Sequence, residues 1–126
     1  METKPIFDLH TEHSEQVNRL KFYKDEIEIM HHRLSEIAKK NSSAETLSLV
    51  DHFENQFMIQ EKVIADLKHQ IKAKEKSLEL GISINPTASD HRRGDIETDV
   101  EDEVDTFEKN FNEIRSEFIK FLSKRM

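Results

Sequence analysis

The chain contains no cysteine, and this absence removes several classes of chemistry. Without thiols there is no disulfide framework, no thiol catalysis and no cysteine-ligated zinc or iron–sulfur centre. The stretch from Met1 to Leu9 also lacks the basic start and apolar run of a signal peptide. These two observations together predict a cytoplasmic protein.

Glycine and proline are almost as scarce, with two of each in 126 residues. Sheet-containing folds need many turns, and this chain has few residues that favour turns. The length suits one domain, so we expect a single all-α domain over residues 1–126. No apolar run is long enough to predict a membrane-spanning helix. The net charge of −7 makes nucleic acid and anionic membranes unfavourable partners.

What the chain does contain is apolar residues at helical spacing, in three stretches at about 9–39, 44–80 and 98–125. Steps of three and four residues place them on one stripe of each helix. We therefore predict an elongated antiparallel three-helix bundle with a coiled-coil-like core. Its core residues are Leu9, His13, Leu20, Tyr23, Ile27, Met30, Leu34 and Ile37, then Val50, Phe53, Phe57, Ile64, Leu67, Ile71 and Leu78, and finally Val104, Phe107, Phe111, Ile114, Phe118 and Phe121.

Capping patterns mark where the second and third helices begin. Ser42 followed by Glu45, and Thr98 followed by Glu101, each fit a capping box, in which both side chains accept bonds from free backbone N–H groups. The short segment before the second helix predicts an antiparallel hairpin.

A second, longer connection is expected from 81 to 95. Gly81 is a typical C-terminal stop for a helix, and Asn85-Pro86 is a typical turn sequence. Loops of this length in a compact domain are usually functional or disordered. This loop is therefore a candidate binding segment.

Some apolar residues lie away from the predicted core stripes. Phe22 and Ile29 lie roughly opposite the core line of the first helix, and Met58 and Ile59 lie off the main line of the second. Single exposed apolar residues are normal, but a second apolar face indicates a further burial surface. We expect self-association of the bundle through these four residues into a larger helical assembly.

Seven histidines suggest a metal site as the alternative interpretation. The hairpin brings His13 level with His69 and the expected loop carries His91 towards them, with His10 one turn from His13. Imidazole and carboxylate ligands suit zinc, iron or manganese. Against this, the paired Glu-x-x-His motifs of ferritin-like diiron bundles do not meet at one level here, and surface histidines without function are common.

Enzymatic motifs are missing from the sequence. It has no glycine-rich phosphate loop, no Gly-x-Ser-x-Gly elbow and no His-Glu-x-x-His helix. The leading interpretation is a non-enzymatic helical interaction or scaffold protein that self-associates, binds an unidentified protein partner and carries no cofactor. The alternative is a histidine/carboxylate metal-binding bundle with a hemerythrin- or ferritin-like role in metal or oxygen sensing or storage.

Four short blocks of the first two helices carry a resemblance to known proteins. They are Leu9-His10-Thr11-Glu12-His13, Phe22-Tyr23-Lys24-Asp25-Glu26, Asp51 to Phe57, and Leu67-Lys68-His69. Together these blocks resemble a family of small bacterial all-helical proteins to which no function is assigned. The resemblance implies an all-helical cytoplasmic protein and supplies no activity and no site residues.

Overall fold

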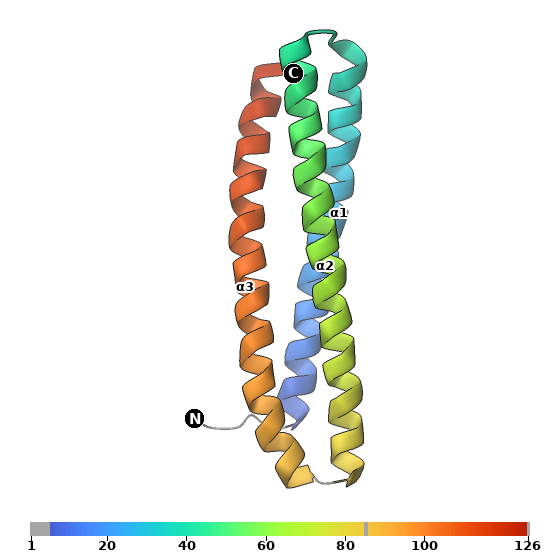
Figure 1. Ribbon diagram of the computed structural model, residues 1–126, viewed down its shortest axis with the longest axis vertical. Helices are drawn as coiled ribbons and strands as arrows, with labels where there is room; N and C mark the ends of the chain where they lie inside the picture. Colours follow the sequence, from blue (N-terminus) through green and yellow to red (C-terminus); the bar gives the residue numbers. More distant parts are fainter. Residues whose placement is uncertain (1–5, 85, 126) are drawn as a thin grey trace.

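Three long helices lie side by side in the computed structural model of the chain (Figure 1). They are α1 (Ile6–Lys40), α2 (Ala44–Ile84) and α3 (Pro86–Arg125). The structure describes the backbone of residues 6–84 and 86–125, and the side chains of residues 7–80 and 100–125. At about 1.5 Å per residue the helices are roughly 50–60 Å long. The predicted all-α, elongated three-helix bundle is confirmed.

The order of the helices leaves one of the three interfaces small. α2 runs antiparallel to both neighbours, so α1 and α3 run in the same direction, and the C-terminus lies beside the α1–α2 turn (Figure 1). Each outer helix packs extensively on α2, whereas α1 and α3 contact each other much less. The interface between α1 and α3 is therefore the smallest of the three.

A single apolar core receives side chains from all three helices. The predicted core residues are buried, except that Tyr23 and Ile114 are partly buried at its edge. At one end of the core four phenylalanines stack and meet edge to face, with ring centroids 5.1–6.3 Å apart. They are Phe53, Phe57, Phe118 and Phe121. Burying each such ring contributes about 1.5–3 kcal/mol, so this cluster fastens α3 to α2.

Side chains close the turn between α1 and α2. Asn41 donates a hydrogen bond of 2.9 Å from Nδ2 to the Ile37 carbonyl at the end of α1. Ser43, rather than Ser42, caps α2, because its hydroxyl accepts a bond from the Thr46 amide and its carbonyl accepts one from the Leu47 amide. The predicted cap is therefore displaced by one residue. Ser42 and Ser43 carry the same side chain, and the position of Glu45, three residues after Ser42, favoured the wrong one of the two.

The predicted loop over 81–95 is wrong, because α2 continues to Ile84 and α3 begins at Pro86. Glycine stops a helix by adopting positive φ, and neither glycine in the described backbone does so. Proline lacks an N–H and has a helical φ, so it suits the first position of α3. The helix start predicted at Thr98 is also wrong, because α3 begins at Pro86 and Thr98 lies within it.

Substituting Gly81→Ala tests the continuation of α2. In a helix interior glycine is less favourable than alanine by about 0.5–1 kcal/mol, so we expect the variant to unfold at a higher urea concentration. The measurement is urea denaturation followed by circular dichroism at 222 nm. If Gly81 instead ended the helix with positive φ, alanine would lower the stability, and the account of this segment would be wrong.

Candidate interaction surface and the histidine groove

A groove of about 200 Å³ runs between α1 and α3, and we call it the α1–α3 groove. Its floor is apolar and includes the buried Met30 and Phe118. Ile29 on α1 and Ile119 on α3 stand beside it with 60% and 51% of their surface exposed. The complete lining is Glu26, Ile29, Met30, Arg33, Arg115, Phe118, Ile119 and Leu122.

Phe22 extends the apolar surface along α1. It precedes Ile29 by seven residues, close to two helical turns, so both project from the same side of the helix. Phe22 is 57% exposed, although its ring meets Tyr23 edge to face at 5.4 Å. The predicted exposure of Phe22 and Ile29 is confirmed. Ile119 was not identified from the sequence. This residue directly follows the core residue Phe118, and consecutive residues project about 100° apart around a helix, so Ile119 lies off the core stripe.

Ion pairs bridge α1 and α3 along the same side of the bundle. Glu26 on α1 accepts from Arg115 on α3 at 3.3 Å. Further towards the start of both helices, Tyr23 donates a hydrogen bond of 2.6 Å to Glu108. There Arg19 is held by three carboxylates of α3, those of Glu101, Asp105 and Glu108. Polar contacts thus accompany the packing of the Tyr23 ring on Phe107 and Phe111, with ring centroids 5.4 and 4.9 Å apart, where α1 meets α3.

Met58 and Ile59 lie elsewhere, on α2. Both are more than half exposed, as predicted. Because they are consecutive, they project about 100° apart around the helix and do not share a stripe. Neither lines the α1–α3 groove. Their part in self-association stays a prediction.

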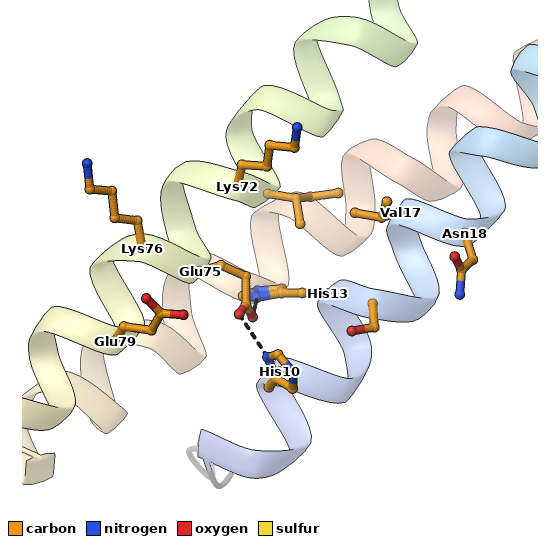
Figure 2. Close-up of a pocket in the computed structure, with 10 residues that line it drawn as sticks. His10, His13, Val17, Asn18, Lys72, Glu75, Lys76 and Glu79 are labelled. Atoms are coloured by element: carbon orange, nitrogen blue, oxygen red, sulfur yellow. Dashed lines mark hydrogen bonds and ion pairs between the residues drawn. The ribbon is translucent and has the colours of Figure 1, made fainter.

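A larger groove of about 580 Å³ lies between α1 and α2 (Figure 2). Two histidines from α1 converge there on one carboxylate of α2. His10 Nδ1 lies 2.8 Å from Glu75 Oε2, and His13 Nδ1 bonds Glu75 Oε1. His13 is buried and His10 is exposed, so the pair spans the edge of the core. Their common carboxylate fastens the start of α1 to the second half of α2.

The predicted metal ligands are brought together only in part. His10 and His13 share Glu75, but His69 is exposed and is not among the groove residues. His91 lies outside the described side chains. Among residues 7–80 and 100–125, no group of three or more histidine or acidic residues is arranged to hold a metal ion. Because His13 lies level with Glu75 rather than His69, the pairing expected from the hairpin was displaced by six residues.

His31 forms a second junction between α1 and α2. Its Nδ1 lies 2.7 Å from Glu54 Oε2 and its Nε2 lies 2.8 Å from Glu61 Oε1, while the ring meets Phe57 edge to face. An imidazolium donates from both nitrogens, whereas a neutral ring donates from one. The protonated form of His31 therefore satisfies both carboxylates at once. This junction and the one at Glu75 act on the same pair of helices.

Lysines from both helices also gather along the α1–α2 boundary. Burial lowers the pKa of Lys68, and the positive charges of Lys24, Lys21 and Lys72 lower it further, while Asp25 opposes the shift. At pH values below the pKa that Lys68 has in the folded chain, its side chain is charged among other positive charges, and this lowers the stability of the bundle. Screening by salt reduces this repulsion, because the lysines are largely solvated.

Comparisons with protein-family models, curated proteins and solved structures find no match to this chain. The resemblance to a family of small bacterial helical proteins therefore stays a prediction. In the described part of the chain, no helix is both long enough and apolar enough to cross a membrane. The evidence on function therefore consists of the surfaces themselves.

Replacing Glu75→Gln tests the histidine junction. Glutamine keeps the shape of the side chain but replaces one acceptor oxygen by an NH₂ donor and removes the charge. It can therefore no longer accept an N–H bond from both His10 and His13, and the charge-assisted part of these contacts is lost. We expect a loss of about 1–2 kcal/mol in the free energy of unfolding, measured by urea denaturation at neutral pH.

Glu79→Gln is the matched control for this change. Glu79 lines the same groove on α2 and is exposed, so its substitution should leave the stability nearly unchanged. Equal losses in the two variants would contradict a specific role for Glu75.

Proposed function

We propose that this chain is a non-enzymatic helical interaction or scaffold protein that self-associates through exposed apolar side chains. It works in the cytoplasm, with protein partners rather than nucleic acid or membranes, and without a cofactor. The observation that carries the proposal is that Ile29 and Ile119, both more than half exposed, line the α1–α3 groove. The equally exposed Phe22 lies two turns before Ile29 on the same side of α1.

The grouping of these residues matters more than their number. A single exposed apolar side chain is ordinary, whereas a contiguous apolar patch beside a groove is typical of an interaction site. Here Ile29 and Ile119 come from different helices and flank a floor that contains Phe118. A helix laid along the groove would cover both residues and exclude water from that floor.

The small size of the α1–α3 interface supports the same conclusion. The contact of α1 with α3 is smaller than either contact with α2, and ion pairs such as Glu26–Arg115 cross it in addition to the packing of Tyr23. Exposed ion pairs contribute at most about 1 kcal/mol each, so the groove gains more from an added apolar face than from its own polar contacts. A further helical layer on this side would complete the burial that three helices leave unfinished.

The variant Ile29→Glu tests whether this surface mediates association. A charge placed where the apolar surface is buried must be desolvated without a partner, so we expect the dissociation constant of the assembly to rise at least about tenfold. Sedimentation equilibrium over a wide range of protein concentrations measures it.

Met58→Glu is the control, because Met58 has nearly the same exposure as Ile29 and also lies within a long helix. Because Met58 lies outside the α1–α3 groove, a contact confined to that groove predicts an unchanged dissociation constant, whereas a contact that also includes Met58, as the sequence predicts, raises it for both variants. A wild-type chain that stays monomeric at every concentration would contradict the proposal. Dissociation by Met58→Glu alone would move the contact to α2.

A further inference from the structure

We infer that the occupant of the α1–α3 groove is a second copy of this chain, packed antiparallel to the first about a two-fold axis that crosses α1 midway between Phe22 and Ile29. This inference rests on the self-association proposed above. It adds the identity of the partner, the direction of packing and the register, none of which follows from exposure alone.

Charge is distributed unevenly along this side of the bundle, beginning with an acidic end. Towards the start of α1 and α3, Arg19 is surrounded by Glu101, Asp105 and Glu108, and the exposed Glu15 lies one turn before it. Carboxylates thus outnumber bases there. A parallel pairing of two copies would place these carboxylates against one another.

The opposite end of the same side is basic. Arg33 lines the groove beyond Ile29, and α1 and α3 both finish with basic last turns. Arg115 lies nearer the centre, where it pairs with Glu26. The last turns contain Lys39, Lys40, Lys124 and Arg125. In an antiparallel pair the acidic end of each copy meets the basic end of the other, and this complementarity occurs twice. Antiparallel packing also opposes the dipoles of α1 and α3 to those of the partner.

The positions on α1 determine the register. Glu15, Phe22, Ile29 and Glu36 recur every seven residues and so lie along one line of the helix. An axis midway between Phe22 and Ile29 places each of these two residues against the other in the partner. The same axis places Glu15 level with Glu36, where Arg33 and Lys40 lie one turn away on either side. Apolar residues then meet at the centre. Towards each end Glu15 lies level with a like charge, Glu36, so the favourable contacts of Glu15 there are with the neighbouring basic residues, the partner's Arg33 and the partner's Lys40.

The available area is sufficient for a stable pair. α1 has 35 residues, so this side of the bundle is about 50 Å long and, across two helices, about 20 Å wide. That gives on the order of 1,000 Å² for each chain, against roughly 800 Å² per partner in a typical stable interface. A short amphipathic peptide would cover only the central apolar part and would leave the charged ends unmatched.

Cysteine trapping tests this geometry, and the natural chain has no cysteine to interfere. Three single variants are made on α1: Glu15→Cys, Asp25→Cys and Glu36→Cys. All three positions are exposed carboxylates, so each variant loses the same charge. A disulfide forms only when the two Cα atoms approach to within about 7 Å. Oxidised samples are resolved by non-reducing electrophoresis and mass spectrometry.

The antiparallel pair predicts that Asp25→Cys stays unlinked and serves as the control, because Asp25 lies about 60° around α1 from the line of Phe22 and Ile29, on the side of Lys68 of α2. Glu15→Cys and Glu36→Cys stay unlinked when each is oxidised alone, and they link to each other when mixed, with a yield roughly tenfold or more above either alone because pairing raises the effective concentration. Higher salt should raise the dissociation constant of the cysteine-free chain, since charge pairing is screened.

Other outcomes overturn the inference in distinguishable ways. Self-linking of Glu15→Cys and Glu36→Cys would show parallel packing. No linking in any sample, while the cysteine-free chain still associates in sedimentation, would place the contact on another surface and leave the proposed self-association intact. A monomeric chain in sedimentation would remove both the proposed function and the inference.

Discussion

Aromatic packing between α2 and α3 is the interaction on which the rest of the bundle depends. The stack of Phe53 and Phe57 against Phe118 and Phe121 fills the end of the core near the α1–α2 turn. Buried rings of this size contribute several kcal/mol together, more than the solvated ion pairs on the surface. α3 is therefore oriented by its phenylalanine stripe, which faces α2.

That orientation accounts for the small interface between α1 and α3. With most of its large apolar residues directed at α2 and the central core, α3 meets α1 through the packing of Tyr23 on Phe107 and Phe111 and through ion pairs of Arg19 and Arg115. Ile119, one residue after a core phenylalanine, remains at the surface beside Ile29. The α1–α3 groove is thus a consequence of how the core is filled. By contrast, α1 is fixed to α2 by carboxylates that reach His13 and His31 as well as by the core.

Much of the fold was predictable from the sequence, because helical periodicity is a local signal. The stripe that contains Leu20, Ile27 and Leu34 identifies buried positions without knowledge of the neighbours. Helix ends were less predictable. Gly81 and Pro86 favour a break in isolation, yet glycine tolerates a helical φ and proline suits a first turn, so tertiary context decided the outcome.

The candidate site was only partly predictable. The exposure of Phe22 and Ile29 follows from their angle to the core stripe, whereas the addition of Ile119 required the relative rotation of two helices. The pairing of His13 with Glu75 depended on the register between α1 and α2. Counting residues from the turn placed His13 level with His69, six residues before Glu75. Side chains on one helix are predictable from spacing, but contacts between helices require the packed structure.

Small-angle X-ray scattering tests the central claim, that a second chain covers the α1–α3 side, most directly. Side-by-side pairing predicts a scattering mass of two chains with a larger cross-section and a maximum dimension close to the length of one bundle, roughly 60 Å with some allowance for side chains. A mass of one chain at every concentration would contradict the claim. A mass of two chains with a nearly doubled maximum dimension would also contradict it, because the copies would then meet end to end.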